Sequence, residues 1–150
     1  MKKLNLLNGQ EMTLSYKFLR DTLSRLGYTF YTANNEFHDN GIDANASVVK
    51  TYLVKDGKSF NSIIVADNGK GMSLETLPNA LNLGESTGKN ANDNVGLYGT
   101  GMKSAALSYG QCLEVFTKCK ETETVYYGVL DVSEGGNNET PVFYYGEADE

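Results

Sequence analysis

The sequence predicts an α+β domain, a two-layer α/β sandwich in which a mixed, mostly antiparallel sheet carries its helices on one face. Two observations support this fold class. Short β-branched and aromatic runs come in consecutive pairs separated by turn residues, which is typical of antiparallel hairpins. Segments with helical spacing of apolar residues lie before and between these pairs. With 150 residues, 40% of them hydrophobic, the chain can enclose one core, so we expect residues 1–150 to form a single domain.

Four helices are expected. The first covers Leu14–Leu26, in which Leu19, Leu23 and Leu26 share one face. The second covers residues 34–46, which contain no proline and a single glycine. The other predicted helices lie at about residues 73–82 and 100–109.

Five strands are expected. Val48–Val54 and Ser59–Ala66 form a hairpin around Asp56-Gly57, a strong turn signal. Within the second of these strands, the run Asn61–Ala66 is predicted to be buried because it is β-branched and apolar. A second hairpin and a last edge strand complete the sheet: Gln111–Lys120, Thr122–Val132 and Pro141–Gly146.

Charge and composition limit the kinds of partner. The formal net charge is −6, and residues 121–150 carry eight acidic residues and no Lys or Arg. An acidic domain is a poor nucleic-acid binder, so contact with DNA would need a further domain or a local basic patch. No apolar run approaches the ~20 residues of a membrane span, and the N-terminus lacks a signal-peptide pattern, which predicts a cytoplasmic protein with no membrane contact. Cys112 and Cys119 form no CxxC pair and are expected to be free thiols.

The second predicted helix carries a polar stripe. Glu36, Asn40 and Asp43 follow helical spacing, beside an apolar stripe that includes Gly41 and Ala44. A carboxylate can act as a general base on water, and an amide oxygen suits Mg²⁺. The alternative is a solvated polar face. His38 points to another face and is expected to be exposed.

A glycine turn follows the Asn61–Ala66 strand. Asp67 stands at the strand end, and Gly69 and Gly71 permit a close approach between backbone and ligand. A buried carboxylate needs a hydrogen-bond donor, and the exocyclic amine of a purine would supply one. The alternative is an Asx turn, in which Asp67 and Asn68 bond their own backbone.

A glycine-rich loop precedes the fourth predicted helix. Gly96, Gly99 and Gly101 lead into it, with Lys103 and Ser104 adding a charge and a hydroxyl. Free N–H groups and the dipole at a helix N-terminus favour phosphate. The loop follows neither the Rossmann nor the Walker A pattern, and the alternative is a flexible loop without a ligand. Residues 84–94 are rich in Gly and Asn and are a candidate lid.

These three segments, in this order, resemble the N, G1 and G2 boxes of the GHKL ATPases, which have the Bergerat ATP-binding fold. The family includes the gyrase B subunit, the ninety-kilodalton heat-shock chaperone, sensor histidine kinases, MutL and the MORC proteins. The resemblance implies that Glu36 activates the hydrolytic water, Asn40 holds Mg²⁺ and Asp67 reads the adenine amine. It also implies that the other residues of the boxes bind ATP: Asp43, Ala44, Gly69, Gly71, Met72, Gly96, Leu97, Tyr98, Gly99, Thr100, Gly101, Met102, Lys103 and Ser104.

Two details are closest to MORC and MutL. Asp43-Ala44-Asn45-Ala46-Ser47 resembles their continuation of the first box, and the order Lys103-Ser104 resembles the MORC form of the third. Phe37 and His38 depart from the aliphatic pair that usually follows the glutamate. The family also has a fourth box, and Thr124 and Thr140 are both candidates for its threonine.

The resemblance implies an ATPase that uses ATP and Mg²⁺ and hydrolyses slowly, with nucleotide acting as a switch of conformation and of homodimerisation. We expect an effector or transducer domain to lie outside this chain, which would be either a minimal ATPase domain or the N-terminal fragment of a longer protein. Two alternatives remain: a histidine-kinase-type catalytic domain with its acceptor histidine on another chain, and an ATP-binding module without turnover.

Overall fold

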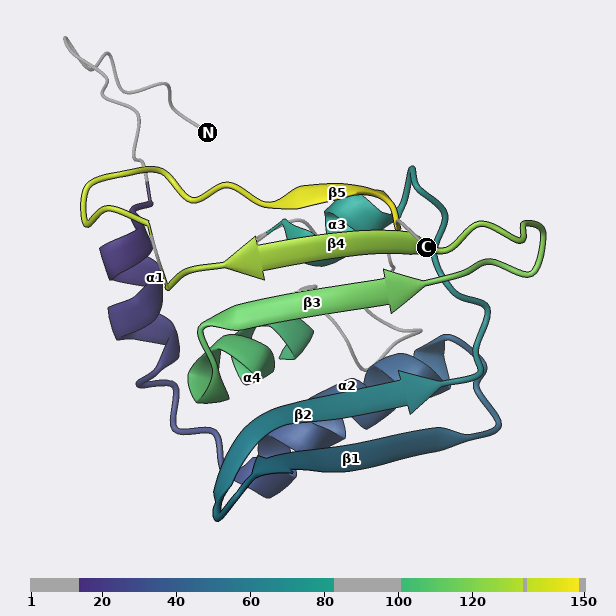
Figure 1. Ribbon diagram of the computed structural model, residues 1–150, viewed down its shortest axis with the longest axis horizontal. Helices are drawn as coiled ribbons and strands as arrows, with labels where there is room; N and C mark the ends of the chain where they lie inside the picture. The colour runs from purple at the N-terminus through teal and green to yellow at the C-terminus, as the bar shows by residue number, and fades with distance from the viewer. Residues whose placement is uncertain (1–13, 83–100, 134, 149–150) are drawn as a thin grey trace, which may run out of the picture.

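A computed structural model describes residues 14–82, 101–133 and 135–148. These residues form an α+β fold, as predicted, with the strands in one layer and helices α2, α3 and α4 behind them in the view of Figure 1. In chain order the elements are α1 Tyr16–Leu23, α2 Phe30–Asp43, β1 Val49–Asp56, β2 Ser59–Asp67, α3 Leu77–Leu81, α4 Gly101–Tyr109, β3 Cys112–Thr117, β4 Tyr126–Asp131 and β5 Tyr144–Glu147. No helix among the described residues is long and apolar enough to cross a membrane.

Side-chain caps set where the first two helices begin. The hydroxyl of Ser15 accepts a hydrogen bond from the Phe18 amide at the start of α1. Thr29 and Thr32 cap α2 reciprocally, so this helix begins at Phe30 rather than at residue 34 as predicted. The prediction for Leu26 was wrong: α1 ends at Leu23, and Leu26 lies beyond it with 48% of its surface exposed.

The strands of the described residues form two antiparallel sheets. The predicted hairpin is confirmed, with β1 paired to β2 from Val49 opposite Asp67 to Asp56 opposite Ser59. The second sheet has the order β3-β4-β5, with β5 at its edge as predicted. Figure 1 shows the β2 and β3 arrows pointing the same way, but the described strands form only antiparallel ladders, so the parallel part of the expected mixed sheet is not seen there.

The hydrophobic core lies between the three-stranded sheet and helices α1, α3 and α4. Its buried members are Leu19, Leu23, Leu77, Leu81, Leu107, Leu113, Leu130 and Val132. The β1–β2 hairpin lies outside this cluster, and β2 is mostly exposed: Ile63 is 38% and Ile64 50% exposed. The prediction of a buried strand at Asn61–Ala66 was therefore wrong, because the hairpin is a two-stranded ribbon outside the main core.

Candidate functional site

Helix α2 packs directly on the end of the β1–β2 hairpin through Gly41. This glycine is buried, and a Cβ atom built on it would lie 2.6 Å from Cγ2 of Val49 and 3.5 Å from Cβ of Asp67. A larger residue at this position would force the helix away from the hairpin. The polar stripe of α2 and the carboxylate at the end of β2 are thereby held next to each other.

The turn after β2 is closed by its own side chains. Oδ1 of Asp67 accepts a hydrogen bond from the Gly69 amide at 2.8 Å, so the Asx turn considered from sequence is present. Oδ1 of Asn68 accepts from the amides of Ser47 and Val48, which ties this turn to the loop after α2. Within the described part of the chain, Oδ2 of Asp67 has no hydrogen-bond partner, and the side chain is exposed. One carboxylate oxygen is thus fixed, and the other remains able to accept.

The two glycines of this turn are required by close approaches within the protein. A Cβ atom at Gly69 would lie 2.6 Å from Cβ of Ala44, whose carbonyl accepts from the Lys70 amide. Gly71 has φ +68°, and a Cβ atom there would lie 2.1 Å from the Lys118 carbonyl oxygen. These contacts explain the glycines without any ligand and bring the turn against the C-terminal end of β3.

Thr117 is a site residue that the sequence reasoning missed. Its buried hydroxyl, at the end of β3, accepts a hydrogen bond from the Met72 amide at 2.8 Å. This bond fixes the far side of the glycine turn, and Met72 packs against the core. The alternation that places Leu113 and Thr117 on the inner face of β3 was the sequence signal that could have found it.

The carboxylate of Glu36 lies against the first residue of α4. A Cβ atom at Gly101 would be only 2.1 Å from Oε2 of Glu36, so only a glycine lets the two approach this closely. The helix N-terminus favours a negative charge at this position. Burial raises the pKa of Tyr28, and the nearby Glu36 carboxylate raises it further. The close approach of Glu36 to Gly101 brings the first and third sequence segments together.

Asn40 lies one turn after Glu36 on α2. Its Nδ2 atom donates to the backbone carbonyl of Glu36 at 2.6 Å, and the residue is exposed. Because the amide nitrogen is used in this bond, Oδ1 is the atom left to act as a ligand. Asp43 is the half-buried last residue of α2, and Ala44 is its C-cap.

The described part of the third segment turns its side chains inward. Gly101 to Ser104 form the first turn of α4; Met102 packs on the core, and Lys103 and Ser104 are 1% and 8% exposed. The Nζ atom of Lys103 donates to the carbonyls of Asn79 and Asn82 at the end of α3. The charge and hydroxyl expected beside a phosphate are therefore directed into the protein. The groups of α4 that could still meet a phosphate are its backbone N–H groups. Gly96, Leu97, Tyr98, Gly99, Thr100 and the candidate lid lie outside the described residues.

His38 is not exposed as expected. It is half-buried, and its Nε2 atom lies 3.0 Å from the hydroxyl of Thr51 on β1. The Thr51 hydroxyl donates its only hydrogen to Oδ1 of Asn34, so Nε2 of His38 is the donor to Thr51. This chain of bonds holds the middle of α2 on β1. The structure does not decide between the two fourth-box candidates: Thr124 is half-buried and Thr140 is exposed, and among the described residues neither has a hydrogen bond to Asp67.

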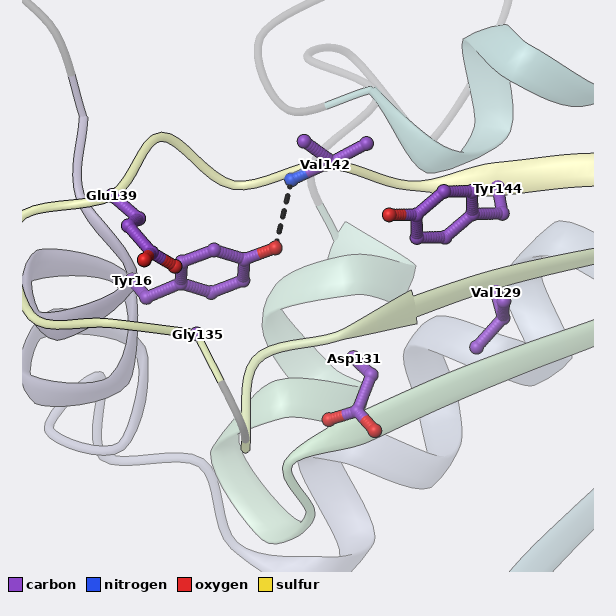
Figure 2. A pocket seen from close by; sticks show the side chains of 7 residues that line it. All are labelled: Tyr16, Val129, Asp131, Gly135, Glu139, Val142 and Tyr144. Atoms are coloured by element: carbon purple, nitrogen blue, oxygen red, sulfur yellow. Dashed lines mark hydrogen bonds between the residues drawn. The ribbon is translucent and has the colours of Figure 1, made fainter.

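A separate cleft of about 340 Å³ lies between α1 and the segment before β5. Figure 2 shows Tyr16 and Tyr144 facing it, with the Tyr16 hydroxyl accepting from the Val142 amide. The carboxylates of Asp131 and Glu139 also line this cleft, so its charge disfavours phosphate. No described residue of the three sequence segments contributes to its lining.

Comparison with known proteins identifies the family of the chain. The family described as histidine kinase-, DNA gyrase B- and HSP90-like ATPase matches residues 28–143. Protein MICRORCHIDIA 7 of Arabidopsis thaliana is 31% identical over 88 residues, which cover 56% of this chain and 12% of that protein. ATPase MORC2B of Mus musculus is 29% identical over 119 residues, or 77% of this chain and 11% of its own length.

ATPase MORC2 of Homo sapiens is 26% identical over 124 residues, which cover 81% of this chain. The chain spans only 12% of that protein, so the likeness concerns one region of a much longer relative. The family match, in contrast, covers most of the chain and includes the helix, the glycine turn and α4. The chain therefore belongs to the histidine kinase-, DNA gyrase B- and HSP90-like ATPases, the GHKL family, and is MORC-like within it.

Proposed function

We propose that this domain binds ATP with Mg²⁺ among its three motif segments and hydrolyses it slowly. The observation that carries the proposal is the contact between the Glu36 carboxylate and Gly101 at the start of α4. A helix N-terminus attracts phosphate, and a carboxylate beside it is placed to take a proton from a water that attacks that phosphate. Membership of an ATPase family supports the same reading.

The residues around this contact fit a nucleotide. The free Oδ2 of Asp67 can accept from the exocyclic amine of adenine while Gly69 holds Oδ1 in place. The backbone N–H groups at the start of α4 would meet the phosphates, since the side chains of Lys103 and Ser104 point inward. The remaining residues of the third segment, from Gly96 to Thr100, would complete the phosphate loop.

Asn40 fits the part of a magnesium ligand. Asn40 is exposed, and its Oδ1 is a hard oxygen donor of the kind Mg²⁺ takes together with phosphate oxygens and waters. When bound, the ion would neutralise phosphate charge. The bond from Asn40 Nδ2 to the Glu36 carbonyl holds the amide in the orientation that this role requires.

We further propose that nucleotide binding switches conformation and homodimerisation, as a MORC- or MutL-like module of a longer cytoplasmic protein. The support for the MORC-like part of this proposal is the likeness to ATPase MORC2 of Homo sapiens, of which this chain spans 12%. Residues 1–150 would then be one ATP-binding domain whose effector or transducer domain lies elsewhere. Contact with DNA would come from that further part, because the domain itself is acidic.

The test is Glu36→Gln, which keeps the shape of the side chain and removes the base. We expect the affinity for ATP, measured by calorimetry, to stay within about threefold of wild type. Phosphate release should fall by roughly 10²- to 10⁴-fold, the usual contribution of a general base. Undiminished hydrolysis in this variant would show that Glu36 is not the base.

Two other results would redirect the proposal. Labelled phosphate that appears on a partner protein instead of in solution would indicate the histidine-kinase alternative. Tight ATP binding by the wild type with no phosphate release would indicate a binding module without turnover.

A further inference from the structure

Lys103 is the most deeply buried charged residue among those described, with 1% of its surface exposed. A buried ammonium group is costly unless it is hydrogen-bonded. Its Nζ atom donates to the carbonyl oxygens of Asn79, in α3, and of Asn82, the C-cap residue of α3. These carbonyls belong to the negative end of a helix, where a cation is stabilised.

This lysine and Gly101 anchor opposite sides of the same helical turn. Lys103 follows Gly101 by two residues, or about 200° around the helix axis at ~3.6 residues per turn. Gly101 faces Glu36 on α2, while Lys103 reaches α3. The first turn of α4 is therefore held between the helix that carries Glu36 and the end of α3.

We propose that Lys103 is a positioning residue for ATP hydrolysis: its ammonium group ties the first turn of α4 to α3 and so fixes the α4 amides relative to Glu36. It acts through the placement of the helix and does not contact phosphate. This proposal rests on the proposed function. Its immediate consequence is that Lys103 affects turnover more than nucleotide affinity.

The variants Lys103→Met and Lys103→Arg test this, with Lys58→Met as a control at an exposed lysine in the β1–β2 turn. Lys103→Met keeps the length of the side chain and removes its donors. We expect kcat to fall by about 100-fold, the effect of a shift near 1 Å between reacting groups. The Kd for a non-hydrolysable ATP analogue should change by less than about threefold. Lys103→Arg should restore part of kcat because it keeps the donors, and Lys58→Met should match wild type.

A large loss of analogue affinity in Lys103→Met, with kcat at saturation unchanged, would overturn the proposal and indicate a direct phosphate contact. A lower melting temperature with unchanged kcat and Kd would also overturn it, because the lysine would then serve stability alone.

A measurement on the wild type covers the case in which Lys103→Met does not fold. In NMR spectra of ¹⁵N-labelled protein, the ammonium hydrogens of Lys103 should exchange slowly with water. The chemical shift of the Nζ atom should stay at its value in the nucleotide-free protein when the ATP analogue binds. A signal that exchanges fast, or that moves by a large amount on binding, would contradict the carbonyl anchor. If the wild type itself does not release phosphate, the proposed function fails, and the same Nζ signal still decides whether Lys103 anchors α4.

Discussion

Replacing Gly101 with alanine should separate the Glu36 carboxylate from α4 without unfolding the domain. The added Cβ atom would stand 2.1 Å from Oε2 of Glu36, and real Cβ contacts essentially never fall below 3.0 Å. The carboxylate must therefore retreat by about 0.9 Å, which its flexible side chain allows. A misplacement of that size between reacting groups costs about 100-fold in rate. Alanine in place of glycine near a helix start costs no stability from propensity, so the melting temperature should not fall.

The assay is phosphate release at saturating ATP, with Gly146→Ala as the control because a Cβ atom at Gly146 meets nothing within 4 Å. The double variant with Glu36→Gln gives the stricter comparison. If Gly101→Ala acts by displacing Glu36, it should add little to the loss that Glu36→Gln already causes. Wild-type turnover in Gly101→Ala, or full additivity in the double variant, would refute this reasoning.

Three further predictions concern the glycine turn and the sheet. Asp67→Asn should weaken binding of an ATP analogue by about 1–3 kcal/mol in calorimetry, since it replaces a charged acceptor at the adenine site, and an unchanged Kd would remove that assignment. Gly71→Ala should lower the melting temperature markedly, because its Cβ atom would meet the fixed Lys118 carbonyl at 2.1 Å and its φ is +68°; a wild-type melting curve would show that this approach is not kept in solution. The hydrogen bond to Glu114 raises the pKa of Tyr127 to about 12, so stability should fall as pH rises from about 10 towards 12, where the unfolded chain loses this proton and the folded one keeps it. Ultraviolet titration of Glu114→Gln should show Tyr127 ionising at lower pH, and an unshifted titration would exclude this cause.

Local patterns predicted the elements that present the site. The spacing of Glu36 and Asn40 placed both on α2, and the Asp56-Gly57 turn placed the hairpin that α2 packs against. The helix predicted at about residues 100–109 is present as α4 over the described residues Gly101–Tyr109. These features depend on neighbours in the chain, which is why sequence alone could anticipate them.

Features that depend on tertiary packing were missed. The half-buried position of His38 follows from how α2 lies on β1, and the exposure of Ile64 follows from the hairpin lying outside the core. A β-branched run cannot show whether its sheet is covered on both faces. Likewise, a lysine in a glycine-rich segment suggests a phosphate ligand. In the structure, Lys103 instead points into the protein and donates to the carbonyl of Asn82 at the end of α3.

A calorimetric titration of the purified chain with a non-hydrolysable ATP analogue, with and without Mg²⁺, tests the central claim most directly. The three-segment site predicts saturable binding that Mg²⁺ strengthens and that Asp67→Asn weakens. Absence of binding at millimolar analogue would contradict the claim that these residues form a nucleotide site within this chain.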